Sequence, residues 1–425
     1  MDATRTSYSP KRGKVAGFLN SEKLVWPISM FGTAVGAGIL FLPIQAGLQG
    51  IWPLIIIAVL AAPLTYYPHL AFGRFALSSI NKAADFSGVL QEHFGAKVSL
   101  VITLFYFFSL YPYILVYGPS MTNTIDDILV TQLGSSPLVR WQLSGIILLI
   151  MFAPTFFGLR YVLEAFKVLV FPLILVLFGI SIYLIPQWSL SAVEIGSMPS
   201  AGTIVDQVYR TLPIMVFALF YAPAIPIMAY VLRHTHGDKA EEVSDRTLKF
   251  SSIMLFAFMM FFVLSCVLAT SPEQLALAKS QNITILSFLA NTLDLPVISV
   301  VGPIITITAI YSSFLAFYLG SKEALTGLLK VGSPEVVNLV GERKISAVLF
   351  VFFFGTIWLA AIIELPLIGV IGDLFAPFIA IILFLLPMYA IRTVPALAKY
   401  RGALSNIFVT IAGLVTVSAI LRNFF

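Results

Sequence analysis

The most informative stretch of the sequence is FGTAVGAGILFLP, from residue 31 to residue 43. It lies within a run of apolar residues long enough to cross a bilayer. Its glycines, Gly32, Gly36 and Gly38, each weaken an α-helix by about 1 kcal/mol relative to alanine. In hydrocarbon an interrupted helix leaves backbone groups unpaired, so it persists only where it lines a polar cavity. The stretch therefore predicts a place where backbone meets a polar solute, or else a close helix contact through small residues.

The composition of the whole chain is typical of a membrane protein. Hydrophobic residues make up 59% of the chain and charged residues 11%, whereas ordinary soluble domains carry about 25% charged residues. The sequence therefore predicts an all-α polytopic membrane protein. The single cysteine, Cys266, excludes an internal disulfide framework.

Apolar windows of about twenty residues predict the transmembrane helices. We expect eleven transmembrane helices, near residues 24–46, 50–72, 97–119, 142–157, 162–185, 208–232, 248–269, 296–319, 345–363, 369–390 and 405–423. The segments between them are too short for a soluble domain. The longest of these segments are 120–141, 186–207, 270–295 and 320–344.

The basic residues indicate the orientation in the membrane. With the N-terminus in the cytoplasm, 21 of the 25 Lys and Arg residues fall in the N-terminal tail or in cytoplasmic segments. The other four are Arg140, Arg210, Lys279 and Arg422. The positive-inside rule therefore predicts a cytoplasmic N-terminus and an external C-terminus. The same arrangement explains the basic isoelectric point without a nucleic-acid partner.

Signatures of enzymes and metal sites are missing from the sequence. It contains no GxxxxGK[ST] run, no HExxH and no Cys/His cluster with metal spacing. The four histidines, His69, His93, His234 and His236, are scattered along the chain. We therefore expect no enzyme, no cofactor and no metal centre, and a transport role would draw on ion or solute gradients.

A second apolar span is also interrupted. Residues 213–226 read PIMVFALFYAPAIP, which places Pro213, Pro223 and Pro226 in one membrane segment. Proline removes a backbone donor and clashes with the preceding turn. The two interruptions fall in the first and sixth spans, at matching positions of two five-span halves. Such pairs are typical of transporters built from inverted repeats with a site at mid-membrane, although two unrelated kinks would look the same.

The sequence resembles the hydroxy and aromatic amino acid permease family, especially its bacterial serine and threonine proton symporters. The resemblance covers nearly the whole chain after residue 23. It is carried by FGTAVGAGILFLPIQAG (31–47), YFFSLYPYILVYG (106–118), TNT (122–124), VFPLILVL (170–177), YLIPQW (183–188), AKSQNITILSFLAN (278–291) and LPMYAIRTVPALAKYRG (386–402).

The resemblance implies the five-plus-five inverted-repeat fold of the amino acid–polyamine–organocation superfamily, with broken helices 1 and 6. An eleventh helix is appended to the two repeats. The expected divisions are a cytoplasmic tail (1–23), a first five-helix repeat (24–185), a second repeat (186–390), and a loop with helix 11 (391–425).

The family's substrate site maps onto the two interruptions. At the first, the resemblance implies that the N–H groups of Ala37 and Gly38 bind a carboxylate, because the start of a half-helix favours an anion. Thr33 belongs to this site, and Gly36 allows close approach. At the sixth, backbone carbonyls would face the substrate ammonium; they belong to Phe217, Ala218 and Phe220.

Tyr111 is a further candidate, as a wall or hydroxyl partner of the substrate. Tyr106, Tyr113 and Tyr117 lie in the same segment and are equally visible in the sequence. A buried, interfacially anchored tyrosine is the competing explanation for Tyr111.

Departures from the family pattern bear on the substrate. Serine-type members carry Ser, Asn and His through the sixth-span interruption, where this chain has Ala218, Phe220 and Tyr221. A pocket with fewer polar partners discriminates less well in favour of a hydroxyl group. The sequence therefore predicts an amino acid that is larger or more apolar than serine.

Other departures concern the coupling ion. Where the family has a lysine in the eighth span, this chain has Ser312; conversely, Lys167 in the fifth span replaces a small polar residue. Lys167 could serve as a tethered cation that couples transport to protons, or could form a helix ion pair with Glu164, one turn away. Alternatively, sodium would bind the oxygens of a site between the first and eighth spans, at Gly32, Val35, Ser312 and Ser313.

Taken together, these features predict a secondary active transporter that imports an amino acid across a bacterial inner membrane by proton symport. Its partners would be a small molecule, the amino acid, together with a proton (or sodium) and membrane lipid. A sodium-coupled carrier of the same fold and a sensor that binds amino acids without moving them are the alternatives. A channel fits less well, because no ring of pore charges is evident.

Overall fold

The computed structural model describes residues 22–82, 84–157, 159–189, 198–292, 296–364 and 376–421. Throughout these residues the regular secondary structure is helical, and no strand occurs among them. The predicted all-α class is therefore confirmed for the part of the chain described.

The helices follow one another with short connections. The first half of the chain forms α2 (Glu22–Ala34), α3 (Ala37–Gly47), α4 (Ile51–Leu77), α5 (Phe86–Asp127), α6 (Arg140–Phe156) and α7 (Leu159–Tyr183). The second half forms α8 (Ala201–Ala218), α9 (Ala224–Thr235), α10 (Ala240–Leu268), α11 (Pro272–Ser280), α12 (Ile285–Thr292), α13 (Pro296–Gly332), α14 (Pro334–Val340), α15 (Glu342–Ile362), α17 (Ala376–Ala380), α18 (Leu386–Thr393) and α19 (Leu404–Leu421). Short π- or 3-10 turns extend or join them: η1 (Ile128–Gln132), η2 (Ile185–Gln187), η4 (Gly237–Lys239), η5 (Ile381–Leu385) and η6 (Pro395–Tyr400).

Several helices are long and apolar enough to cross a membrane. Six of the described helices meet this test, and the bent pair α2 and α3 makes a seventh if it is counted as one span. Three shorter apolar helices cover Arg140–Phe156, Pro377–Thr393 and Leu404–Ser418. A polytopic membrane protein is thus confirmed, whereas the count of eleven spans stays a prediction.

Some helices extend beyond the spans that hydropathy predicts. The span expected at 97–119 belongs to α5 (Phe86–Asp127), which is kinked at Gly95 and then continues to Asp127. The span expected at 296–319 belongs to α13, which continues to Gly332. The segment 270–295 holds α11 and α12, and Ser271 begins α11 with a capping box that includes Gln274. Hydropathy marks only the apolar part of a helix, so polar extensions with good caps escape it.

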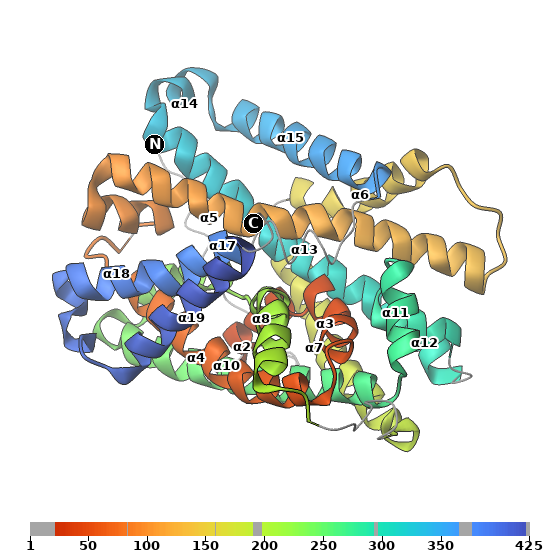
Figure 1. Ribbon diagram of the computed structural model, residues 1–425. Helices are drawn as coiled ribbons and strands as arrows, with labels where there is room; N and C mark the ends of the chain where they lie inside the picture. The colour runs from red at the N-terminus through yellow and green to blue at the C-terminus, as the bar shows by residue number, and fades with distance from the viewer. Residues whose placement is uncertain are drawn as a thin grey trace.

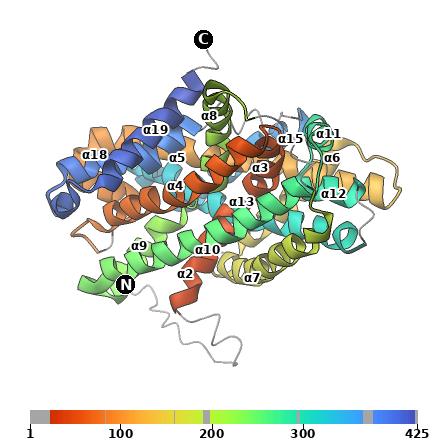
Figure 2. The same cartoon turned by 60° about the horizontal axis from the view of Figure 1, so that its bottom comes forward.

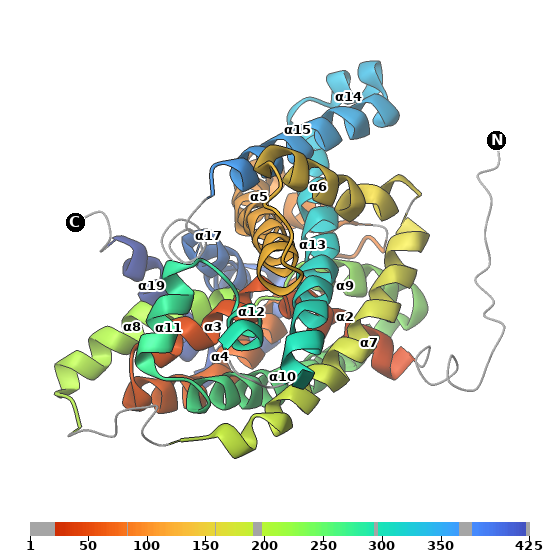
Figure 3. The same cartoon turned by 90° about the vertical axis from the view of Figure 1, so that its right-hand side faces the viewer.

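The long helices form a bundle around the interrupted ones. α5 and α13 lie against each other over much of their length (Figure 1), and α10 runs beside α4 (Figure 2). Figure 3 shows α15 and α14 at one edge, with α6 next to α15. This arrangement leaves the two interrupted segments in the interior.

A group of charged and aromatic side chains joins three elements at one end of the bundle. Arg74 of α4 forms an ion pair with Asp245 of α10 at 2.7 Å, and its guanidinium lies 3.9 Å from the ring centre of Tyr400 in η6. Glu241 of α10 accepts hydrogen bonds from Tyr400 and from Lys399. Burial, together with the adjacent Glu241 carboxylate, raises the pKa of the Tyr400 phenol, which keeps its proton as a donor.

Candidate functional site

The interruption of the first span, here called the first break, separates α2 from α3. α2 ends at Ala34 and α3 begins at Ala37, and the two helices are bent by 56°. Every residue from Met30 to Ile44 is buried. The sequence motif that predicted a broken helix therefore forms one, in the interior of the protein.

Gly36 leaves room for a neighbouring helix. Its φ of −143° is accessible to other residues, so the need for glycine is one of space. A Cβ atom at this position would lie 2.5 Å from the Cβ of Ser313 and 2.8 Å from the hydroxyl of Tyr117. Gly36 thus lets α13 and α5 approach the first break closely.

Two hydroxyl groups hold the first break from outside. The Oγ of Ser313 donates to the carbonyl of Thr33 at 2.6 Å, and it lies 2.5 Å from the hydroxyl of Tyr117. Because the Ser313 proton is used on a carbonyl, which can only accept, Tyr117 is the donor in the second bond. The hydroxyl of Thr33 itself donates to Ser29 within α2, so Thr33 offers its carbonyl at this point.

The oxygens expected to form a cation site are only partly brought together. Ser313 reaches the first break, but at the carbonyl of Thr33. Its neighbour Ser312 is buried and donates to Ala309 within α13 at 3.2 Å. Gly32 and Val35 are both buried in the same segment. The geometry therefore separates the roles of two serines that are adjacent in sequence.

The interruption of the sixth span, here called the sixth break, separates α8 from α9. α8 ends at Ala218, and Pro223 caps the start of α9 at Ala224. Every residue from 211 to 226 is buried. Pro223 falls at the interruption, where it has no N–H to continue the hydrogen-bond ladder, whereas Pro213 lies inside α8 and Pro226 in the first turn of α9.

An aromatic stack covers the end of α8. The hydroxyl of Tyr113 donates to the carbonyl of Phe217 at 2.9 Å, so this carbonyl, which was expected to bind the substrate ammonium, is paired in the structure. The Tyr113 ring stacks on Phe217 and on Phe317, with centroids 3.8 Å apart in both cases. Tyr113 and Phe317 thus contact the sixth break, and the sequence did not single them out.

The two breaks meet at Gly38. A Cβ atom on Gly38 would lie 2.8 Å from the ring of Phe217 and 2.9 Å from the Cα of Ala218. The start of α3, where Ala37 and Gly38 lie, is thus directly against the end of α8. A helix start favours negative charge and a helix end favours positive charge, so this contact suits a molecule that carries both.

A buried histidine supports the sixth break. The backbone N–H of Tyr221 donates to the Nε2 of His69 at 3.2 Å, and the two rings stack with centroids 3.7 Å apart. The Tyr221 hydroxyl lies 2.8 Å from the Oγ of Ser252 in α10. Phe220, beside Tyr221, is also buried and lies against the His69 ring. No pattern in the sequence predicted this role for His69.

Tyr111 lies away from both breaks. It is half-buried and its ring stacks on Phe107 and Phe352, between α5 and α15. Residues two apart on a helix point about 200° apart, so Tyr111 cannot share the face of Tyr113. The spacing of seven and then four residues from Tyr106 through Tyr113 to Tyr117 marks one helix face, and is the signal that would have identified the relevant tyrosines.

The expected coupling pair is not tested. Lys167 and Glu164 fall in the first part of α7, and their side chains lie outside the described residues.

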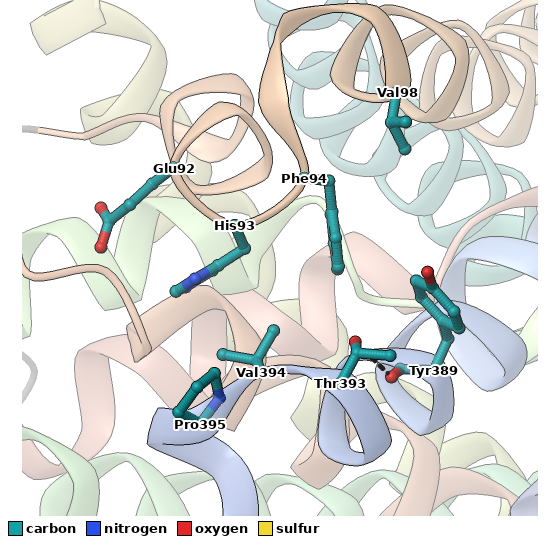
Figure 4. Close-up of a pocket in the computed structure, with 8 residues that line it drawn as sticks. All are labelled: Glu92, His93, Phe94, Val98, Tyr389, Thr393, Val394 and Pro395. Carbon is teal, nitrogen blue, oxygen red and sulfur yellow. Dashed lines mark hydrogen bonds between the residues drawn. The ribbon is translucent and has the colours of Figure 1, made fainter.

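Two surface pockets lie apart from the breaks. One, of about 800 Å³, contains charges of both signs, from Asp126, Asp127, Arg140, Lys279 and Glu364. The other, of about 450 Å³, lies between α5 and the end of α18 and is lined by Glu92, His93, Phe94 and Tyr389 among others (Figure 4). Neither is lined by residues of the two breaks.

Comparison with known proteins places this architecture in a family. The tryptophan/tyrosine permease family matches residues 21–421. The serine transporter SdaC of Escherichia coli is 41% identical over 429 residues, which cover all of both chains. The serine transporter SdaC of Shigella flexneri is 40% identical with the same coverage.

Solved transporters share the fold at low sequence identity. MhsT in complex with L-phenylalanine has a TM-score of 0.62 at 14% identity, covering 95% of this chain and 98% of that one. A nucleobase-cation-symport-1 family transporter, closed around bromovinylhydantoin, has a TM-score of 0.55 at 15% identity, covering 94% and 92%. The expected resemblance is confirmed, and a transport rather than an enzymatic role follows from it. The chain belongs to the tryptophan/tyrosine permease family.

Proposed function

We propose that this protein imports an amino acid across a bacterial inner membrane by proton symport and alternating access. The observation that carries the proposal is the contact between the two breaks, where Gly38 at the start of α3 lies against Ala218 at the end of α8. In this proposal the two breaks belong to two five-helix repeats (24–185 and 186–390), with helix 11 appended and the N-terminus in the cytoplasm.

The contact between the breaks supports recognition of a zwitterion. Free N–H groups in the first turn of α3, at Ala37 and Gly38, would bind the carboxylate. Carbonyls at the end of α8, including that of Phe217, would bind the ammonium once the Tyr113 hydroxyl gives way. That exchange replaces one hydrogen bond with a charge-assisted one, which is roughly twice as strong.

The identity of the amino acid is open to two proposals. The similarity to serine transporters favours serine. The walls of the sixth break favour a larger or more apolar side chain, because Ala218 and Phe220 offer no side-chain hydrogen bond and the Tyr221 hydroxyl already pairs with Ser252. Thermal stabilisation of the purified protein by each of the twenty amino acids ranks the two proposals, and serine above every apolar and aromatic amino acid would reject the second.

Two proposals also exist for the coupling ion. Lys167, protonated and deprotonated in turn, would couple transport to protons. Sodium coupling is favoured by one observation, the pair of oxygens formed by the Ser313 hydroxyl and the Thr33 carbonyl, 2.6 Å apart between the first break and α13. Carbonyl and hydroxyl oxygens of this kind are typical sodium ligands in broken-helix transporters.

Uptake into proteoliposomes tests these proposals together. An inward proton gradient without sodium is expected to drive accumulation of the preferred amino acid, and Lys167→Met is expected to remove that drive. Strict dependence on a sodium gradient would transfer the coupling role to Ser313. Binding without uptake under any gradient would support a sensor instead of a carrier.

A further inference from the structure

A pocket of about 800 Å³ lies at the end of the bundle where α5 finishes. Its walls come from the end of α5, the start of α6, the α11–α12 segment and the residue Glu364 after α15, and Figure 1 shows α11 and α12 beside the end of α5. Its volume falls within the range of small-molecule sites, roughly 300–1,000 Å³. With the orientation proposed above, the pocket opens to the outside, and the recognition proposed between the breaks does not use it.

Arg140 supplies a cation that neutral groups hold in place. Its Nε donates to the carbonyl of Ala361 at 2.7 Å, and its Nη2 donates to the Oδ1 of Asn123 at 2.8 Å. Neither acceptor carries a charge, so these bonds orient the guanidinium without neutralising it. A planar guanidinium that is fixed in this way is suited to binding a carboxylate.

The carboxylate that Arg140 meets in the structure is loosely held. The Nη1 of Arg140 lies 3.2 Å from an oxygen of Glu364, whose side chain is 64% exposed. Ion pairs with so exposed a partner contribute little stability. Glu364 also has a φ of 54°, a left-handed conformation that residues with a Cβ atom disfavour. A free carboxylate can therefore replace Glu364 at Arg140 at little cost.

The opposite charge in the pocket comes from Asp126 and Asp127 at the end of α5. Both oxygens of Asp127 accept from the side-chain amide of Asn291 in α12, at 2.8 Å and 3.0 Å. This donor is neutral as well, and neither aspartate forms an ion pair with any residue that the structure describes. Asp127 is thus a fixed anion that lacks a cationic partner.

We propose that this pocket is a second binding site for a free amino acid, in which Arg140 binds the carboxylate and Asp127 binds the ammonium. One fixed cation and one fixed anion on the walls of the same pocket are complementary to a zwitterion, and less so to a simple anion or cation. Lys279, which also lines the pocket, lies 3.5 Å from the Oε1 of Gln45 in α3. The pocket therefore adjoins the half-helix that begins at the first break. The inference rests on the proposed function for the class of ligand.

A fluorescent label on the pocket wall reports whether the pocket is occupied. Gln281 is exposed and lines the pocket, so Gln281→Cys is labelled with an environment-sensitive fluorophore, while Cys266 is fully buried and stays unlabelled. The probes are L-serine and L-phenylalanine, one for each proposal on the substrate. We expect a saturable change in fluorescence with at least one of them. Ethanolamine and phenethylamine lack the carboxylate, and hydroxypropionate and phenylpropionate lack the ammonium, so these four should have no effect. No response to either amino acid, or an equal response to an analogue, overturns the proposal.

Two carboxylates of the pocket give opposite predictions for the Kd of the responding amino acid in the labelled protein. Asp127→Asn keeps the shape of the side chain and removes the charge that binds the ammonium, so the Kd is expected to rise about tenfold or more. Glu364→Gln removes the competitor at Arg140, so the Kd is expected to fall. A general effect of one lost negative charge would shift both values in the same direction. Shifts in the same direction, or an unchanged Kd in Asp127→Asn, overturn the proposal.

The matched control is Glu273→Gln, because Glu273 is a carboxylate at the start of α11 that does not line the pocket; its Kd should equal that of the parent protein. Gly36→Ala separates the pocket from the site between the breaks, since it fills the first break. The fluorescence response should persist in Gly36→Ala, and its loss there would assign the signal to the breaks and overturn the proposal. A failure of the proposed function shows separately, as a protein that binds the amino acid in the pocket but takes none up under any gradient.

Discussion

The first and sixth breaks are held by different kinds of contact. At the first break, space is the constraint: Gly36 admits Ser313 and Tyr117, and one hydroxyl bonds the carbonyl of Thr33. At the sixth break, stacked aromatic rings fill the space, and two of them also bond the backbone, Tyr113 at a carbonyl and His69 at an N–H. The first break is therefore expected to be the fixed side of the site, and the sixth the side that rearranges.

The largest effect is expected from filling the space at the first break. Gly36→Ala would place a methyl group 2.5 Å from the Cβ of Ser313, and overpacking of this kind costs about 1–3 kcal/mol. Uptake should be abolished while the protein still inserts. Gly355→Ala is the control, because nothing lies within 4 Å of that position. If Gly36→Ala takes up the amino acid as well as Gly355→Ala does, the first break can accommodate a methyl group. That result would contradict the view that space is the constraint at the first break.

A smaller but clear effect is expected from the hydroxyl that holds the first break. Ser313→Ala removes the bond to Thr33 and leaves the buried Tyr117 hydroxyl without this partner, at a cost of about 1–3 kcal/mol. Thermal stability and uptake should both fall. Ser312→Ala should have less effect on either, since its hydroxyl bonds only its own helix at 3.2 Å. Equal effects of the two variants would contradict the assignment of Ser313.

At the sixth break, loss of one neutral hydrogen bond should be milder. Tyr113→Phe keeps the stack on Phe217 and Phe317 and removes only the bond to the Phe217 carbonyl, worth about 1 kcal/mol. We expect a several-fold change in the Kd of the amino acid, measured by calorimetry. Tyr111→Phe is the matched control, because Tyr111 faces α15, and a larger change there than at Tyr113 would reverse our placement of the two tyrosines.

The smallest effect is expected at Ser252. Ser252→Ala removes the partner of the Tyr221 hydroxyl but leaves the bond from the Tyr221 backbone to His69. The free energy of unfolding, measured by thermal denaturation, should fall by roughly 1 kcal/mol. A larger loss than in Ser313→Ala would contradict this order of effects at the two breaks.

The sequence predicts the breaks well because their causes are local. Glycine and proline act on the backbone of the residues that carry them, so Gly36 and Pro223 mark the interruptions without knowledge of any partner. Burial of both motifs follows from their apolar character. Effects that depend only on the residue itself can be predicted from a single sequence.

The contacts across the breaks could not be predicted in the same way. His69 and Tyr221 are separated by 152 positions, and nothing near either residue marks the other. Ser312 and Ser313 look alike in sequence, yet neighbours on a helix point about 100° apart and only one meets Thr33. The rotation of α13 against α2 decides between them, and that rotation depends on the packing of the whole bundle.

The group of Arg74, Asp245, Glu241 and Tyr400 has a practical consequence for measuring motion. It fastens η6 to α4 and α10, and α19 begins at Leu404, four residues after Tyr400. The last helix is therefore attached to the helix that carries His69 and to its neighbour. A spin label on its outer face, for instance at Leu414, which is 54% exposed, would report displacement of those helices from a position that touches neither break.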